Sequence, residues 1–573
     1  MKKRIIKIYI ANFILCLTLI FVSCMANAGE IVTSDNPCSI LEDYSQHEND
    51  SKIVLGEKIE NPFSLKSSRM LNTDEKPNYF YFRIRTMSLD ALEQIKVICG
   101  DLNIIPYDYK VIKGGTELLE NSGDDMHSPW YYYVLPSETL DLLHSDDYEI
   151  EILDEMYLTE QQLNYISGGQ ESENQEIYKP EDINSDARFL WFNWASKVPS
   201  GYVYAYDEVT GRYEPVPNVK VTVTQWCFTH SAYTDENGYY NLGVTYTTLF
   251  QDNALVTVWF ENENEDVMYK HFISTSFYNF CHINVKDLSN NNIYLKKGSI
   301  EQKYGNIIRA AELYRKYIKE TAISVTNPEK LKIWAVPDST YGITLMGNEV
   351  IGTQARFMSA YISLIVGGPM SAIISTVTAS VLSTYIPDLI IGCSDYYNNN
   401  GYYVTSTETV FGVMFHELSH ASHYKSLGMK RVDYWATEYT DMLFGWIEIV
   451  FKGLDPFENC YNNGNSDRVC FIESWGYFFG DYLMDKQYGT RTRNNYKQQL
   501  ASISFAKYSY FYNQAYYQLL LQGYSIKDIF YVYRNPNIAS AGQFIDEFSK
   551  IHNLSNSQKN NIVNIFRNRG AKL

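Results

Sequence analysis

The chain has 573 residues, of which 45% are hydrophobic and 20% are charged. This length predicts two to four domains with cores of their own, at roughly 100–200 residues per domain, and the apolar content excludes intrinsic disorder as a class. The 48 Lys and Arg residues against 67 Asp and Glu residues give a net charge of −19, which argues against a nucleic-acid-binding protein because such proteins need a basic surface.

The acidity is confined to the first half of the chain. Residues 301–573 contain 25 Lys and Arg and 23 Asp and Glu, a net charge of +2, so residues 1–300 carry −21. A soluble, well-hydrated exterior is the simplest interpretation of this acidity. A calcium site or a cationic partner is the alternative.

The N-terminus has the pattern of a signal peptide. Basic residues at positions 2, 3, 4 and 7 precede a mostly apolar stretch over 8–22, which is too short for a comfortable membrane span. Phe21-Val22-Ser23-Cys24 resembles a bacterial lipobox with Cys24 as the lipidated residue, whereas Ala26-Asn27-Ala28 fits ordinary signal peptidase. We favour a signal peptide over 1–24, with cleavage after 28 as the alternative. The expected location is the cell envelope, as a lipoprotein of the outer membrane or cell surface, rather than free secretion or the periplasm.

Export permits disulfides. Cys460 and Cys470 bracket a polar loop and are one candidate pair, and Cys227 with Cys281 is another. The uncharged stretch over 357–387 contains early helix breakers and recurring Ser and Thr. We interpret it as buried helical sequence rather than as a membrane span.

Three domains are expected after the signal peptide. Residues 29–190 are predicted to form an acidic α+β accessory domain, with strands over 79–84 and 130–134 and a helix over 89–99. Residues 200–297 are predicted to be all-β, and residues 298–573 to be α+β and mainly helical.

The middle domain is predicted from strand alternation and a turn. Val219, Val221 and Val223 alternate with polar residues, which predicts one buried and one wet face. Asn237-Gly238 predicts a hairpin, because both residues tolerate positive φ. The segments 216–221 and 234–240 resemble the carboxypeptidase regulatory-like, transthyretin-like β-sandwich, which implies a non-catalytic module that serves as a spacer or binds carbohydrate or protein.

The last domain is predicted to contain a helix over 306–320 and strands over 332–336 and 388–391. Thr405-Ser406-Thr407-Glu408 fits the capping box of a further helix, and Gly428 is a suitable end for it.

That capped helix carries His416-Glu417-Leu418-Ser419-His420. Residues four apart share one helix face, so both imidazoles can bind one ion, and Glu417 can act on a water bound to it. Two imidazoles with a carboxylate are typical of catalytic zinc, which keeps a fourth position open. The pattern therefore predicts Zn(2+) bound by His416 and His420.

The motif resembles those of the zincin metallopeptidases. Metzincins are excluded, because their pattern requires Gly and His where this chain has His423 and Ser426. The match is closer to gluzincins, which implies a Glu on a later helix as third ligand. Glu473, in a Glu-Ser-Trp segment like that of some bacterial zinc metallopeptidases, is the favoured candidate; Glu438 and Glu448 are alternatives. The Asp that gluzincins place four residues after this ligand is Tyr477 here.

His423 shares the helix face of His416 but lies about 10.5 Å further along the axis, so we predict a structural or supporting role. The expected function is exported zinc-dependent hydrolysis of peptide bonds, with Glu417 as general base and a peptide or protein as substrate. No nucleic-acid partner is expected, and membrane association is expected only through the possible anchor at Cys24. The alternative function is a surface lipoprotein that binds protein or glycan with an inactive zincin domain. A third interpretation is that the acidic N-terminal domain covers the catalytic half as a pro-segment.

Overall fold

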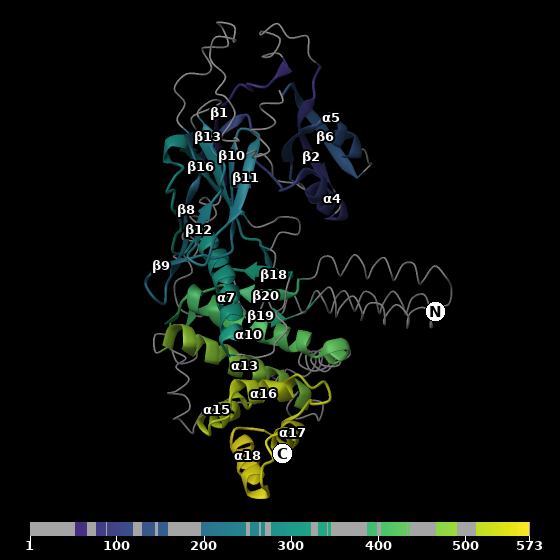
Figure 1. Ribbon diagram of the computed structural model, residues 1–573, viewed down its shortest axis with the longest axis vertical. Helices are drawn as coiled ribbons and strands as arrows, with labels where there is room; N and C mark the ends of the chain where they lie inside the picture. The colour runs from purple at the N-terminus through teal and green to yellow at the C-terminus, as the bar shows by residue number, and fades with distance from the viewer. Residues whose placement is uncertain are drawn as a thin grey trace, which may run out of the picture. The chain divides into compact units, whose positions relative to one another are not determined.

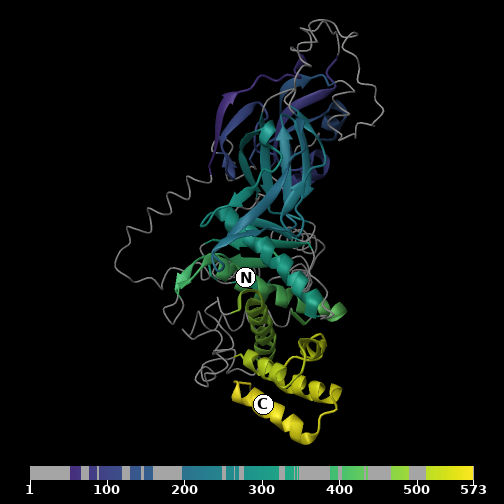
Figure 2. The same ribbon diagram turned by 60° about the vertical axis from the view of Figure 1, so that its left-hand side comes forward.

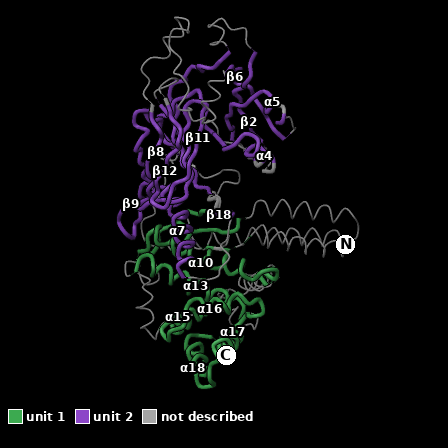
Figure 3. Tube along the Cα trace, viewed as in Figure 1, with its two compact units in different colours: residues 1–47, 334–573 green, residues 48–333 purple. Residues whose placement is uncertain are grey.

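The computed structural model describes residues 52–158, 196–346, 387–435, 466–489 and 511–573, with short gaps inside these ranges. The chain divides into two compact units, of which one comprises residues 48–333 and the other includes residues 334–573 (Figure 3). Helices and strands occur in both, so the protein is a multidomain α+β protein (Figures 1 and 2). The predicted signal peptide, most of the uncharged stretch, Glu438, Glu448 and Cys460 lie outside the described residues.

The unit of residues 48–333 begins with a small antiparallel sheet. Its strands are β2 (Tyr79–Thr86), β5 (Tyr131–Pro136) and β6 (Tyr148–Met156), in the order β5-β2-β6, and α4 (Leu89–Cys99) follows β2. Phe82 and Ile84 of β2 are buried with residues of α4, whereas the opposite face carries cross-strand ion pairs such as Arg83 with Glu151. The predicted strands and helix are confirmed. A smaller sheet joins β1 (Lys52–Lys58), β3 (Tyr109–Lys113) and β4 (Glu117–Leu118).

Two four-stranded sheets follow within the same unit. The first has the order β11-β10-β14-β16, from β11 (Phe228–Tyr233), β10 (Lys220–Gln225), β14 (Asn253–Trp259) and β16 (Phe277–Asn284). The second is built around β8 (Ser200–Asp207), which pairs with β9 (Arg212–Pro215), β12 (Tyr239–Asn241) and β17 (Ile293–Leu295). Short strands β7 (Ser196–Lys197) and β13 (Tyr246–Thr247) pair with each other, and β15 (Glu265–Tyr269) belongs to neither of the two sheets.

The prediction of a wet polar face on β10 is wrong. Thr222 is 2% exposed, and its hydroxyl accepts a hydrogen bond from Nε1 of Trp259 at 2.9 Å. Lys220 forms an ion pair with Asp101. The face is covered because Trp259 belongs to the same buried cluster as Phe82 of the preceding sheet. The alternation of residues along β10 could not reveal that its polar face packs against residues of the preceding sheet.

The prediction of an Asn-Gly hairpin is also wrong. Gly238 has a φ of 76°, whereas Asn237 keeps a negative φ. The turn closes with a hydrogen bond from the Gly238 amide to the Asp235 carbonyl, and it leads from β11 in the first sheet to β12 in the second. It therefore changes sheets instead of pairing two neighbouring strands.

The pairing of Cys227 with Cys281 expected from the sequence does not form, because both residues are free thiols. The candidate pairing of Cys460 with Cys470 includes Cys460, which lies outside the described residues. Cys227 follows β10 and Cys281 lies on β16, with β14 between these strands. Two strand spacings amount to roughly 9–10 Å, which exceeds the reach of a disulfide at about 7 Å between Cα atoms. Cys470 is buried in a helix.

Helix α7 (Ile300–Thr321) follows the second sheet and packs against β8. Gly305 permits this approach, because a methyl group there would lie 2.7 Å from Leu295 and 3.2 Å from Ala205. Arg309 of α7 forms an ion pair at 3.1 Å with Asp207 at the end of β8, and both side chains are buried. The predicted helix is confirmed, and it is grouped with residues 48–333.

The unit of residues 334–573 contains a small sheet and a set of helices. Strand β20 (Leu389–Gly392) lies between β18 (Leu331–Val336) and β19 (Gly342–Thr344), which confirms two predicted strands. A hairpin of β21 (Tyr396–Tyr397) and β22 (Tyr403–Val404) leads into the first helix. The helices are α10 (Ser406–Ser426), α13 (Ser466–Tyr488), α15 (Asn513–Leu521), α16 (Ile526–Tyr533), α17 (Ala541–Ile551) and α18 (Asn556–Asn568). No helix of the described residues is long and apolar enough to cross a bilayer.

Candidate metal centre

Helix α10 carries the two histidines and begins where the capping sequence predicts. The side chain of Thr405 accepts a hydrogen bond from the Glu408 amide, and Gly428 follows the helix with a φ of 63°. Phe411, Phe415 and other apolar residues of α10 are fully buried. The helix is therefore fixed in the core of its unit, and its histidines have defined positions.

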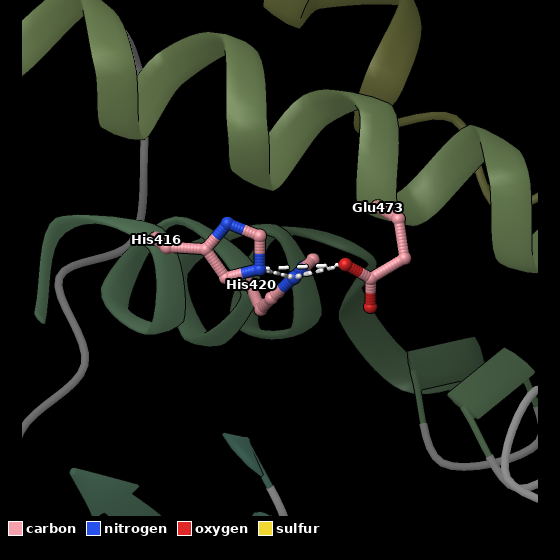
Figure 4. Close-up of side chains that lie close together, drawn as sticks. All are labelled: His416, His420 and Glu473. Carbon is pink, nitrogen blue, oxygen red and sulfur yellow. Dashed lines mark hydrogen bonds and ion pairs between the residues drawn. The ribbon is translucent and has the colours of Figure 1, made fainter. Parts of the chain in front are cut away.

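Helix α13 lies alongside α10 and carries Glu473 (Figure 4). Two glycines one turn apart permit the close packing, since a methyl group at Gly480 would lie 3.1 Å from the backbone of His416. The indole of Trp475 is 1% exposed and donates a hydrogen bond to the Ser419 carbonyl at 3.3 Å. These contacts hold the two helices in one register.

Three side chains from these helices converge. Nε2 of His416 and Nε2 of His420 lie 2.9 Å apart, and Oε2 of Glu473 lies 3.4 Å and 3.6 Å from them (Figure 4). Among the described residues, these three form the one group of His, Cys, Asp or Glu whose ligand atoms are close enough to hold a metal ion. The structure thus brings Glu473 to both histidines.

The spacing of the donor atoms fits a small ion. A tetrahedral ion with bonds of about 2.0–2.1 Å separates its ligand atoms by about 3.3 Å. The two distances to Glu473 match this value, and the two imidazoles need to separate by only a few tenths of an ångström. Two imidazole nitrogens and one carboxylate oxygen are a donor set that zinc commonly takes.

The charges at the site are coupled. Burial opposes ionisation of Glu473, but the charge of His420 and hydrogen bonds to both imidazoles outweigh it and hold the pKa of Glu473 well below its usual range. Burial also opposes protonation of His416, yet the hydrogen bond and charge of Glu473, together with the charge of Glu417, raise its pKa. The carboxylate thus favours positive charge at this point, which a metal cation can supply in place of protons.

Glu417 lies against a neighbouring strand. Oγ1 of Thr344, on β19, donates a hydrogen bond to Oε2 of Glu417 at 2.6 Å. A methyl group at Gly342 would lie 2.4 Å from Oε1 of Glu417, so the strand backbone closely approaches the carboxylate. Burial raises the pKa of Glu417, and the charges of His416 and His420 and the Thr344 bond partly oppose this rise. Glu417 is only 4% exposed, and these contacts hold its side chain in one place.

Sequence reasoning missed Thr344 and Gly476 at the centre, and it assigned no role to Tyr477. Thr344 lies 73 residues before Glu417 and no motif marks it. Gly476, one turn after Glu473, leaves room for the imidazoles, and glycines four apart inside a helix were a usable signal of close packing. The ring of Tyr477, which is 40% exposed, lies 4.5 Å from the ring of His416.

His423 does not join the three ligands. Its Nε2 donates a hydrogen bond to the Tyr533 carbonyl at 3.0 Å, and its side chain is fully buried. Burial, with the charge of His420, lowers the pKa of His423 to about 3. The imidazole is therefore neutral and ties α10 to the end of α16, which agrees with the structural role predicted for it.

Comparison with known proteins adds no assignment. No family model, no curated protein and no solved structure matches the chain.

Proposed function

We propose that the protein is an exported zinc-dependent metallopeptidase of the gluzincin type. The observation that carries the proposal is the convergence of His416, His420 and Glu473 on one point, with Glu417 between the two histidines in sequence. The two imidazoles and the Glu473 carboxylate would hold the ion. The expected location is outside the cytoplasm, on the basis of the predicted export signal, and peptides or proteins are the expected substrates.

When bound, zinc supplies a Lewis acid that polarises a carbonyl and lowers the pKa of water. Glu417 supplies the proton transfers. Its carboxylate accepts a proton from the attacking water and passes it to the leaving amine. A raised pKa suits a group that must both accept and return a proton near neutral pH, and burial raises the pKa of Glu417.

Thr344 and Gly342 support this role by fixing the carboxylate. A general base works only within hydrogen-bond reach of the proton that it takes. The Thr344 hydroxyl occupies one carboxylate oxygen, and the close backbone at Gly342 limits movement of the other. Each restraint keeps the acceptor oxygens in a fixed direction without adding a charge that would compete for the proton.

The test is Glu417→Gln in the purified chain, with zinc content and cleavage of a mixed peptide library measured together. The amide keeps the size of the side chain but cannot accept the proton. We expect about one zinc per chain in both proteins, and cleavage slower by about 100- to 10,000-fold in the variant. Full activity of the variant would overturn the mechanism.

The alternative, a surface binding protein with an inactive zincin domain, gives a different result. It predicts about one zinc per chain and no hydrolysis of any peptide by the unmodified chain. The buried, restrained Glu417 is what favours the enzyme, because an inactive domain has no need of a general base.

A further inference from the structure

Six tyrosines share the outer face of the sheet built around β8. Successive residues of a strand alternate between faces, so Tyr202, Tyr204 and Tyr206 point to one side, while Val203 and Ala205 on the other side are fully buried. Each of the three has a tyrosine opposite it on a paired strand. The pairs are Tyr202 with Tyr239 of β12, Tyr204 with Tyr294 of β17, and Tyr206 with Tyr213 of β9. We call these six residues the tyrosine face.

The six rings form one unbroken series of contacts. Successive ring centroids lie between 5.0 and 5.7 Å apart in the order Tyr239, Tyr202, Tyr204, Tyr294, Tyr213 and Tyr206. Along β8 alone the series extends over about 13 Å, at roughly 3.3 Å per residue. Tyr294 is 45% exposed and Tyr213 is 38% exposed. The face is thus a continuous aromatic surface in contact with solvent.

The hydroxyl groups of this face are available for hydrogen bonds. Within the described part of the chain, the Tyr239 hydroxyl accepts one hydrogen bond, from the side-chain amide of Asn241 at 3.4 Å. The other five hydroxyls form no hydrogen bond. The nearby Asn292 side chain accepts from the Tyr202 amide at 3.2 Å. The surface therefore combines apolar ring carbon with neutral polar groups.

Charge is scarce on the tyrosine face. The outer face of the β2 and β6 sheet shows the contrast, since Arg83 and Arg85 pair there with Glu151 and Glu149. Lys296, two residues after Tyr294, adds one exposed cation beside the tyrosine face, whereas the neighbouring cations Arg212 and Lys297 form ion pairs with Glu214 and Glu208. One cation outside such pairs is too few for a polyanion, whose binding requires several Lys or Arg contacts.

We propose that the tyrosine face binds a neutral polysaccharide. Sugar rings present weakly polar C–H groups, which pack against the negative faces of aromatic rings, and hydroxyls, which pair with tyrosine hydroxyls. A row of identical side chains suits a ligand that repeats. A peptide strand would instead add to a sheet edge, and a membrane surface would require aliphatic residues with several cations. The proposal does not depend on the metal centre.

Affinity electrophoresis of the purified full chain tests this binding. The gels contain soluble neutral polysaccharides, namely dextran, laminarin, galactomannan and hydroxyethylcellulose, and one gel contains heparin as a polyanion. At least one neutral polymer should slow the protein. Replacing both exposed rings, Tyr213→Ala with Tyr294→Ala, should weaken that binding by about tenfold or more, since aromatic residues dominate such surfaces.

Two controls separate the rings from other causes. Lys296→Ala removes the neighbouring charge, and Tyr397→Ala removes an exposed tyrosine, 72% exposed, that lies elsewhere. Both should bind the polymer like the unmodified chain. The proposal is overturned if no neutral polymer slows the protein, if heparin alone does so, or if the double variant binds unchanged. Where the double variant does not fold, Tyr294→Ala alone must show the loss.

Discussion

Gly476 faces the imidazole of His420 so closely that a methyl group at residue 476 would lie 2.6 Å from both Nε2 and Cε1 of that ring. The same methyl group would lie 2.9 Å from Cε1 of His416. Helix α13 therefore contributes twice to the centre. Glu473 supplies an oxygen, and Gly476, one turn further on, supplies the space that the two imidazoles occupy.

The first prediction concerns this space. Gly476→Ala should weaken zinc binding, because at least one imidazole must move. The expected loss of affinity is about 10- to 100-fold, as for mutation of a residue that orients a metal ligand. Gly412→Ala on α10 is the matched control, since a methyl group there meets no atom within 4 Å. Competition with a chromogenic chelator measures both affinities. Equal affinities for the two variants would show that the glycine has no part in the site.

The second prediction separates the rival third ligands. Glu473→Gln should lose zinc, because an amide oxygen carries no charge to pair with the ion. The zinc affinity should fall by about 10- to 100-fold or more, since loss of a residue that only supports a ligand already has an effect of that size. Glu438→Gln should keep about one zinc per chain. Metal analysis after dialysis measures the zinc content per chain of both variants. Retention of zinc by Glu473→Gln together with its loss by Glu438→Gln would reverse the assignment.

Local signals explain how much of the centre could be predicted. The spacing of His416 and His420 fixes their common helix face, and a capping residue marks the start of that helix. Glu473 was reached through a resemblance, not through geometry. Thr344 lies on a strand 73 residues away, and only the packing of β19 against α10 brings it to Glu417.

The fold shows the same division between local and long-range information. Helix α4 has the predicted bounds, and β2 and β5 lie within two residues of the strands predicted at 79–84 and 130–134, because their patterns repeat within a few residues. The predicted solvent exposure of the polar side of β10 is wrong, since Trp259, on another strand, covers Thr222. The pairing of Cys227 with Cys281 failed for a similar reason: it requires neighbouring strands, and the sheet order places β14 between them.

The third prediction concerns the restraint on Glu417. Thr344→Val keeps the shape of the side chain but removes the hydroxyl that lies 2.6 Å from the carboxylate. Once a substrate is known, turnover should fall by about tenfold or more, since hydrogen bonds to charged groups contribute about 1.5–3 kcal/mol. Zinc content should not change. Thr344→Ser should restore turnover, and a serine variant as slow as the valine variant would exclude the hydroxyl as the cause.

The fourth prediction uses the neutral state of His423. Its pKa is lowered to about 3, from 6.5 in an unfolded chain, chiefly by burial. Between these values the unfolded chain binds a proton that the folded chain does not bind. The free energy of unfolding should therefore fall as the pH falls below 6.5, by at most about 1.4 kcal/mol per pH unit from this residue.

Urea unfolding of the chelator-treated protein at pH 7 and pH 5 measures this dependence without a contribution from zinc. His423→Gln keeps a donor that can reach the Tyr533 carbonyl but does not titrate, so its stability should change less between the two pH values. An unchanged dependence in the variant would mean that other groups cause the acid sensitivity.

The fifth prediction concerns the buried pair of Asp207 and Arg309. The Asp207 side chain is fully buried, and its other oxygen accepts hydrogen bonds from the amides of Val209 and Thr210, both at 3.0 Å. Asp207→Asn removes the countercharge and leaves the Arg309 guanidinium buried. Breaking such a pair costs about 3–5 kcal/mol, so thermal unfolding of the unit of residues 48–333 should shift to a clearly lower temperature.

Asp235→Asn is the matched control for this loss. Asp235 also accepts hydrogen bonds from two backbone amides in a turn, those of Asn237 and Tyr239, but it is exposed. An asparagine keeps an acceptor there and leaves no buried charge without its countercharge, so the unfolding temperature should change little. If the two variants unfold at the same temperature, the amide hydrogen bonds, and not the buried charge pair, hold the end of β8.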